Sequence, residues 1–407
     1  GGGKIYKCTT GTDWTLVRTF VSTDGRVQLV ASKTTAGRVV ALCEDSAGLP
    51  VINRSTDGFA TINTSVPLPI STGVAPSPAN DFCRNQAFYD LMIGMNPTND
   101  SEVYVAGIEI FRNTQMFKVT PVAADWVQLT DWTVDPTATG NATASILDGV
   151  HSDHHVMAFA PGLSSRVTFG CDGGIYYSND SGNAIGVRNN GYNVTQFYKG
   201  SINQSGSQKL LAGAQDNGSQ LISPAPVGAG SSFDLFGGDG CWEFIDKQNE
   251  FMVISYVYNT YAFVDYATDA ATVYIANDQG GSDGDFVNQC GLDSNSNILF
   301  ANGSTGATYQ IYRYAITPAT QATVVRTLSN TLINNIPTYF EASPYTANNL
   351  LVGLANGRLI KVIRSNGPTS GPAGSQPAYS NIGNPAWVGA ISDIRFGATD
   401  NEIFITF

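Results

Sequence analysis

All three histidines of the chain lie in one short run, His151-Ser-Asp-His-His155. Histidine and aspartate are ligands that Zn²⁺ and other transition metals take in proteins. If this run is a β-strand, His151, Asp153 and His155 share one face and His154 lies on the other. Ligands spaced in this way are about 7 Å apart, so they converge on an ion only if the strand carries a bulge. We therefore favour the alternative that these groups hydrogen-bond within the fold, with Asp153 fixing a histidine tautomer.

Four aspartates of the same tract are candidate catalytic groups: Asp153, Asp172, Asp216 and Asp239. Two facing carboxylates can cleave a glycosidic bond, one as the acid and the other as base or nucleophile. The last three aspartates, however, precede glycine directly or across one asparagine, and Asp-Gly and Asn-Gly are strong hairpin-turn signals. The turn interpretation is the one we favour. The chain carries no Gly-x-Ser-x-Gly elbow and no phosphate-cradling glycine loop.

Two further residue sets follow from the same tract and from a later loop. The residues expected to bind a ligand are His151, Asp153, His155, Gln215, Asp216, Asn217, Asp239 and Trp242. The later loop is a glycine-rich run at residues 277–285 that holds Asp278, Asp283 and Asp285. Oxygen ligands on such a loop suit Ca²⁺, although the spacing is not that of an EF-hand and a solvated polar turn is the simpler interpretation. No cofactor is required by any of these patterns.

The composition excludes several classes of partner. Charged residues make up only 13% of the 407 residues, and the net charge is −12. Such a chain repels phosphate backbones and anionic lipid, so nucleic-acid binding and membrane attachment are not expected. No apolar run is long enough to insert into a membrane. Six widely spaced cysteines, none in a Cys-x-x-Cys pair, favour disulfides in an oxidising compartment over buried thiols.

A recurring pattern predicts the fold. A turn rich in Pro, Asn and Asp leads to an apolar strand, one or two glycines and a second strand. Copies recur every roughly 40 to 65 residues, and long-period repetition of this kind is typical of a β-propeller. The copies are at residues 38–42, 103–107, 167–170, 210–213, 251–254, 298–301, 350–353 and 402–405. We expect an all-β fold, a seven- or eight-bladed propeller with four-stranded antiparallel blades.

The same repetition predicts one propeller over residues 1–407, with residues 151–246 as its motif-rich blades. The last residues alternate between apolar and polar types with no turn after them. We therefore expect a fragment that ends before the ring closes, within a longer parent chain. Two proline-rich stretches break the rhythm, residues 64–81 and 364–386, and both are expected to be irregular surface loops.

Three segments resemble degenerate Asp-box (BNR) turns of the form Ser-x-Asp-x-Gly: residues 22–25, 55–59 and 178–182. Such turns mark the propellers of sialidases, xyloglucanases and sortilins. In them the aspartate accepts hydrogen bonds from turn amides, and glycine supplies a positive φ. The Asp-box is a structural device, so it implies a propeller and says nothing about catalysis.

A longer resemblance covers residues 151–246. The ordered motifs HSDHH, FGCDGGIYYSND, NNGYNVTQFY, AGAQDNG and GGDGCW are similar to sortilin-like Asp-box modules of large secreted Bacteroidetes proteins. Residues 85–90 and 391–397 match the same group. The resemblance implies an extracellular or outer-surface location, export by the type IX system and further domains in the same parent chain.

The leading functional hypothesis is a non-catalytic binding or adhesion module for a glycan or protein ligand. Its ligand would lie on a face that carries the histidine run, Asp216 and Asp239. One alternative is a glycoside hydrolase of xyloglucanase type that uses two of the four candidate aspartates. Another is a sortilin-like propeller that captures peptides in its tunnel.

Overall fold

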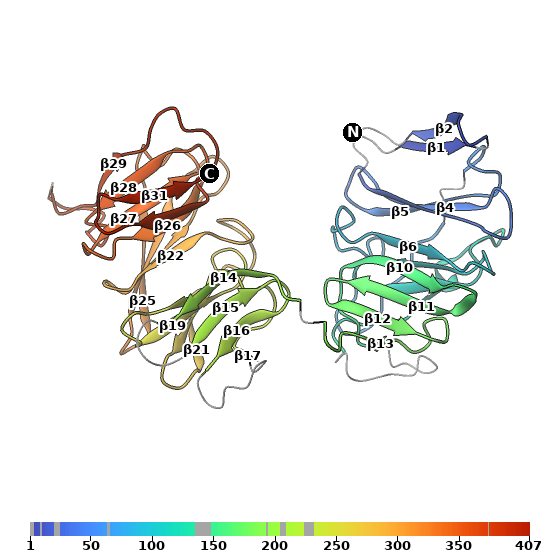
Figure 1. Ribbon diagram of the computed structural model, residues 1–407, viewed down its shortest axis with the longest axis horizontal. Coiled ribbons are helices and arrows are strands. Elements are labelled where there is room, and N and C mark those ends of the chain that lie inside the picture. Colours follow the sequence, from blue (N-terminus) through green and yellow to red (C-terminus); the bar gives the residue numbers. More distant parts are fainter. Residues whose placement is uncertain are drawn as a thin grey trace. The chain divides into compact units, whose positions relative to one another are not determined.

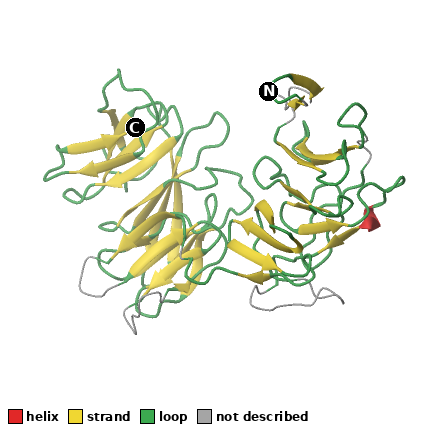
Figure 2. Cartoon of the chain, turned by 45° about the vertical axis from the view of Figure 1, so that its right-hand side comes forward, coloured by secondary structure: helices red, strands yellow, loops and turns green. Residues whose placement is uncertain are grey.

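The computed structural model describes residues 4–8, 10–19, 25–62, 66–134, 148–192, 194–203, 209–223, 232–372 and 374–407. Within these residues the chain is built from β-strands, and the single helix is one 3-10 turn, η1 (Ala123–Asp125) (Figure 2). None of the described helices is long and apolar enough to cross a membrane. The prediction of an all-β fold is confirmed.

The chain divides into two compact units, Gly1–Asn193 and Val194–Phe407. The strands of the first unit are β1 (Lys4–Cys8), β2 (Trp14–Thr19), β3 (Val27–Ala31), β4 (Val39–Glu44), β5 (Pro50–Ser55), β6 (Met92–Met95), β7 (Val103–Ala106), β8 (Ile110–Asn113), β9 (Trp126–Gln128), β10 (His154–Ala160), β11 (Leu163–Cys171), β12 (Gly174–Ser178) and β13 (Gly186–Val187). They form the antiparallel sheets β1–β2, β3–β5, β6–β9 and β10–β13 (Figure 1).

The second unit continues the same pattern. Its strands are β14 (Phe197–Ile202), β15 (Leu210–Ala214), β16 (Gly218–Ile222), β17 (Phe233–Asp234), β18 (Phe244–Ile245), β19 (Phe251–Ser255), β20 (Tyr261–Asp265), β21 (Ala271–Ala276), β22 (Cys290–Asp293), β23 (Ile298–Asn302), β24 (Ile311–Thr317), β25 (Ala322–Leu328), β26 (Pro337–Ala342), β27 (Asn349–Leu354), β28 (Leu359–Ile363), β29 (Ala378–Asn381), β30 (Asp393–Phe396) and β31 (Ile403–Thr406). The sheets are β14–β17, β18–β21, β22–β25, β26–β29 and β30–β31.

Every sheet is an up-and-down meander in which each strand pairs with the next along the chain. Six of the nine sheets in the described residues have four strands. Successive four-stranded meanders of this kind are the blades of a β-propeller. The prediction of propeller blades is therefore confirmed, while a single ring over residues 1–407 stays a prediction. The motif-rich tract at residues 151–246 supplies the last sheet of the first unit and the first sheet of the second.

The repeated apolar segments found in the sequence are the second strands of successive sheets. Residues 103–107 cover β7, residues 251–254 lie in β19 and residues 298–301 lie in β23. A second strand is paired along both edges and covered on both faces by neighbouring blades. Its side chains therefore have little contact with water, and all residues of β7, β19 and β23 are buried. This burial explains why the repeat reads as an unbroken apolar run.

The hydrophobic cores lie between successive sheets of each unit. One core in the first unit joins Val40 and Leu42 of β4 to Val103 and Val105 of β7. In the second unit, Phe300 of β23 packs in one core with side chains from the sheet β26–β29. A single sheet cannot bury both of its faces, so each depends on its neighbours within the unit.

The first strands of the sheets lie next to one another within each unit. In the first unit β6 contacts both β3 and β10, and in the second unit β26 contacts both β22 and β30. The loops that enter and leave these strands are therefore brought together, although they are far apart in the sequence. Such a meeting place is where a propeller can build a site from several blades.

The two proline-rich segments differ in structure. Residues 66–81 contain no helix or strand. The expectation of an irregular loop over residues 364–386 is wrong at its centre, because β29 (Ala378–Asn381) lies there and pairs with β28. Pro377 directly precedes β29, which is the outermost strand of its sheet, and a proline that cannot donate a ladder hydrogen bond is tolerated at such an edge.

Two of the three Asp-box-like turns share one hydrogen-bond pattern, and the third, at residues 22–25, lies mostly outside the described residues. In both turns a serine hydroxyl donates to the aspartate and accepts the amide four residues on, as Ser55 does with Asp57 and Phe59. The same arrangement links Ser178 to Asp180. Hydrogen bonds from the side chain and amide of Thr61 hold the pKa of Asp57 down to about 2.

We expect Asp180→Ala to lower the free energy of unfolding by about 1–3 kcal/mol, because the Ala184 amide and the Ser178 hydroxyl both lose an acceptor. Chemical denaturation measures this change. Asn179→Ala in the same turn is the matched control, since the exposed Asn179 side chain forms no hydrogen bond within the described residues, and we expect a change within about 0.5 kcal/mol. Equal losses in the two variants would contradict a structural role of the aspartate.

The expectation of disulfides is wrong, because all six cysteines are thiols. Cys43 packs in the core between the sheets β1–β2 and β3–β5, and Cys290 packs in the core between β18–β21 and β22–β25. The Cys83 thiol packs directly against Gly107, because a Cβ added to Gly107 would lie only 2.5 Å from the Cys83 sulfur. Cys43, Cys83 and Cys290 thus fill small volumes in three separate cores, as small apolar residues do.

Candidate functional site

The tip of the β11–β12 hairpin places Asp172. Cys171 pairs with Gly174, so Asp172 and Gly173 form the two-residue turn, as the Asp-Gly signal predicts. The side chain also makes specific contacts. Its Oδ1 lies 2.6 Å from Nε2 of His155, and its Oδ2 accepts a hydrogen bond from the Tyr89 hydroxyl at 2.8 Å. The ring of Tyr89 packs edge-on against His155, with centroids 4.8 Å apart.

The histidine run is not a regular strand, which corrects the expected arrangement of its side chains. β10 begins only at His154, and Asp153 before it has a φ of 62°. This left-handed residue breaks the alternation on which a shared face for His151, Asp153 and His155 depended. His155 instead pairs with Asp172, while Nδ1 of His151 lies 3.2 Å from the carbonyl of Ser152. The carboxylate that pairs with His155 is thus Asp172.

His154 has a structural role. It is fully buried, and its Nδ1 donates a hydrogen bond to the carbonyl of Gly107, which links β10 to the turn after β7. Burial lowers the pKa of His154 to about 4, so the imidazole is neutral at physiological pH. The histidine therefore ties two neighbouring sheets of the first unit together.

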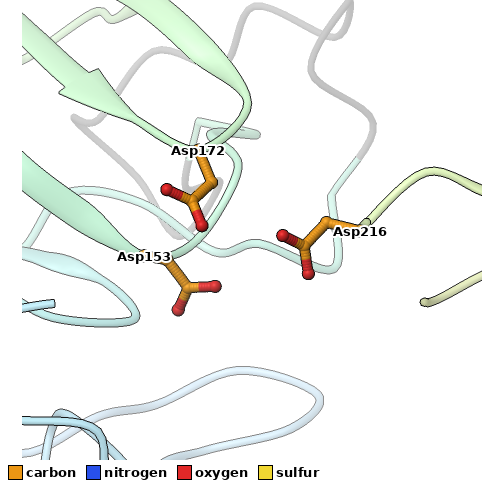
Figure 3. A group of neighbouring side chains, drawn as sticks. All are labelled: Asp153, Asp172 and Asp216. Carbon is orange, nitrogen blue, oxygen red and sulfur yellow. The ribbon is translucent and has the colours of Figure 1, made fainter. Parts of the chain in front are cut away.

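Asp153 and Asp172 form a close pair of carboxylates within the first unit. One oxygen of each lies within 4.8 Å of the other (Figure 3), which is near the separation of about 5 Å used by retaining glycosidases. Asp153 is only 8% exposed, and both oxygens of Asp172 already hold hydrogen bonds to protein groups. Asp216, also drawn in Figure 3, belongs to the second unit and is not part of this pair.

Asp90 is a buried acid that sequence reasoning did not select. It is 0% exposed, and burial together with the nearby charge of Asp153 raises its pKa to about 9. It follows Tyr89, the hydroxyl donor to Asp172, so residues 89 and 90 both belong to the surroundings of the Asp153–Asp172 pair. The sequence indicated residues 85–90 only through their similarity to the sortilin-like Asp-box modules. Nothing in the residue types of this segment predicts that Asp90 is buried.

The predicted residues Gln215, Asp216 and Asn217 form the turn between β15 and β16 in the second unit. Asp239 lies in the loop before β18, and its Oδ1 accepts the amide of Asp216 at 3.1 Å. This loop runs directly against the turn, since a Cβ on Gly240 would meet the carbonyl oxygen of Gly218 at 2.2 Å. The glycine-rich motifs are therefore explained by close backbone packing.

The three carboxylates proposed for Ca²⁺ take separate partners in the described residues. Asp278 accepts the hydroxyl of Ser282 at 2.8 Å, and Asp283 accepts the hydroxyl of Tyr312 at 2.6 Å. Asp285 accepts the side-chain amide of Asn302 at 3.4 Å. Protein hydrogen bonds thus organise this loop, as in the polar-turn interpretation.

Trp242, one of the predicted ligand-binding residues, lines a cavity of the second unit. The cavity has a volume of about 340 Å³ and is lined from the first strand of all five sheets of that unit. β14 contributes Lys199 and Ser201, β22 contributes Cys290 to Leu292, and Trp242 precedes β18. β26 supplies Tyr339 and Glu341, and β30 supplies Arg395. This volume is in the range of small-ligand sites, about 300–1,000 Å³.

Aromatic and cationic groups dominate the cavity. The rings of Trp242 and Tyr339 meet edge-on, with centroids 5.4 Å apart. The ammonium of Lys199 lies 4.5 Å from the centroid of the Trp242 ring and donates a hydrogen bond to the Tyr339 hydroxyl at 2.9 Å. Burial, followed by the charge of Arg395, lowers the pKa of Lys199. Burial is also the main cause that raises the pKa of Tyr339.

Sequence reasoning missed Lys199, Tyr339, Glu341 and Arg395. Tyr339 lies 97 positions after Trp242 in the chain, and no local pattern relates the two. The signal that could have found these residues is the repeat itself, because each lies in the strand that precedes a recognised second strand.

No protein-family model and no curated protein matches this chain. Among solved structures, a chain of a structure titled "Crystal Structure of Mitotic Checkpoint Complex" is similar at 12% sequence identity. The match covers 75% of this chain and 79% of that chain, with a TM-score of 0.36. A likeness of this degree carries no inference about ligands or partners.

Proposed function

We propose that this chain is a non-catalytic binding module of an extracellular or outer-surface protein, with a glycan or protein ligand held in the cavity of the second unit. The cavity at the first strands is the observation that carries this proposal. It combines two aromatic rings with charged groups in a concave site, and aromatic side chains supply much of the contact energy in binding sites.

The candidate carboxylates support binding over catalysis. A general acid and a nucleophile must have oxygens that can reach a substrate. Asp172 uses both of its oxygens to hold His155 and Tyr89, and Asp239 supports the turn of Asp216. The spacing of Asp153 and Asp172 keeps a retaining glycosidase as the second candidate function.

Calorimetric titration of the chain with soluble neutral and acidic polysaccharides tests the proposal, with released reducing ends measured in the same samples. We expect binding without cleavage, and a loss of at least about tenfold in affinity in Trp242→Ala, because an aromatic anchor is removed. Trp242→Phe, which keeps an aromatic ring, should retain part of the affinity. Trp14→Ala is the matched control, since Trp14 is 67% exposed in the first unit.

Two outcomes would overturn the proposal. Binding that survives in Trp242→Ala while the variant remains folded by circular dichroism would place the ligand elsewhere. Reducing ends that appear with the unmodified chain and disappear in Asp172→Asn would establish a hydrolase.

A further inference from the structure

We propose that the cavity of the second unit recognises a carboxylate-bearing sugar, a uronic acid residue of an acidic polysaccharide, with Lys199 as the partner of its carboxylate. This inference rests on the proposed function, because it names the ligand class of the same cavity.

The charges that line the cavity leave one partly buried cation, Lys199, without an ion pair in the described part of the chain. Arg395 forms ion pairs with Glu341 at 3.1 Å and with Asp393 at 3.2 Å. Glu243 is fully buried, and burial raises its pKa to about 8, so it is mostly protonated at neutral pH. Lys199 forms no ion pair among the described residues, and the exposed Lys247 at the same cavity adds a second positive charge.

The surroundings of Lys199 leave it able to take an anion. An ammonium has three N–H donors, and one of them is used by the Tyr339 hydroxyl. The rings of Trp242 and Tyr339 hold the ammonium at 4.5 Å and 5.1 Å, so its position is fixed before any ligand arrives. A partly buried cation that is short of hydrogen-bond acceptors gains more from a carboxylate than an exposed one does. The chain as a whole has a net charge of −12, whereas this cavity attracts anions locally.

The rest of the wall favours a sugar as the carrier of the carboxylate. Ser201 accepts the amide of Ile245 at 3.0 Å and keeps its hydroxyl proton for a ligand. Glu341, about a quarter exposed, offers carboxylate oxygens that can accept sugar hydroxyls. Apolar ring surface beside hydrogen-bonding groups of both kinds matches a pyranose, which has apolar C–H faces and a rim of hydroxyls. A volume of about 340 Å³ suits one such residue better than an extended peptide.

The test measures binding of trigalacturonate to the full chain by calorimetry, beside its methyl ester, which has the same sugar ring without the charge. We expect the free acid to bind and the ester to bind at least about tenfold more weakly, since a charged hydrogen bond is lost. Lys199→Met, which keeps the length of the side chain, should reduce affinity for the acid to that for the ester. Lys33→Met is the control, because Lys33 is exposed in the first unit.

The outcomes separate this inference from the proposed function. If neutral polysaccharide binds in a Trp242-dependent manner and trigalacturonate does not, the uronate inference fails and the binding module stands. Equal affinity of acid and ester, or unchanged affinity in Lys199→Met, would also overturn the inference. If a peptide with a free carboxyl terminus binds at Lys199 and the sugar acid does not, the ligand is a peptide. If no polysaccharide or peptide binds, both proposals fail.

Discussion

Asp90→Asn is expected to make the protein more stable than the unmodified chain at alkaline pH and to flatten its stability profile. The unfolded carboxyl loses its proton near pH 4, whereas the folded carboxyl keeps it up to about pH 9, because burial and the charge of Asp153 oppose ionisation. Between these values the folded state binds more protons, so the free energy of unfolding falls as pH rises. The full contribution is present below about pH 4 and is lost toward about pH 9.

The expected size follows from the same linkage. One unit of pH corresponds to about 1.4 kcal/mol for one proton, so the difference between variant and parent should grow by up to about 4 kcal/mol from about pH 5 to pH 8. Denaturation with guanidinium across that range measures it. Glu109 and Glu243, whose pKa values burial raises to about 8, affect both proteins alike and cancel in the difference.

A matched control for Asp90→Asn is Glu250→Gln, which removes one negative charge from an exposed position. Its difference from the parent should not change with pH over that range by more than about 0.5 kcal/mol. Parallel pH profiles for Asp90→Asn and the parent would show that Asp90 is ionised in the folded protein, contrary to its place in the interior.

Phe300→Ala is expected to lower the free energy of unfolding by about 3–5 kcal/mol, because the removed ring leaves a cavity that its neighbours only partly fill. Phe300 lies in β23, is 0% exposed and packs in the core between β22–β25 and β26–β29. The loss therefore measures the packing of one blade against the next. Chemical denaturation followed by tryptophan fluorescence gives the value.

Val325→Ala in the outer strand β25 of the same sheet is the control for this core, since Val325 is 47% exposed. We expect it to change the free energy of unfolding by less than about 0.5 kcal/mol. If both variants lost stability equally, pairing within the sheet, rather than packing between blades, would hold this unit together.

Stability and ligand binding depend on different strands of each sheet. The buried second strands stabilise each unit, while the first strands are free to carry polar and aromatic groups at the place where they meet. Trp242, Tyr339 and Lys199 lie at that place in the second unit. The chain therefore separates residues that hold the fold from residues available to a ligand, which suits a binding module.

The sequence alone determined the fold class and the positions of the second strands. Those strands are buried on both faces, so consecutive side chains along them are apolar. Residues 298–301 show this pattern in the sequence. The sequence also predicted that Asp172 and Gly173 form a hairpin turn, because Asp-Gly is a strong hairpin-turn signal. Both features leave their signal in a short run of consecutive residues.

The tertiary structure decided which side chains meet. The left-handed conformation of Asp153 breaks the strand alternation, so His151, Asp153 and His155 do not share the expected face. His155 pairs with Asp172 instead. The contacts of Lys199 with Trp242 and Tyr339 join two sheets and the loop before a third, and no spacing in the sequence encodes such a meeting. The physical reason is that a propeller builds its sites from strands that are distant in the chain. The burial and the contact partners of each side chain at such a site depend on how the blades pack. The local sequence pattern of one blade carries no information about this packing.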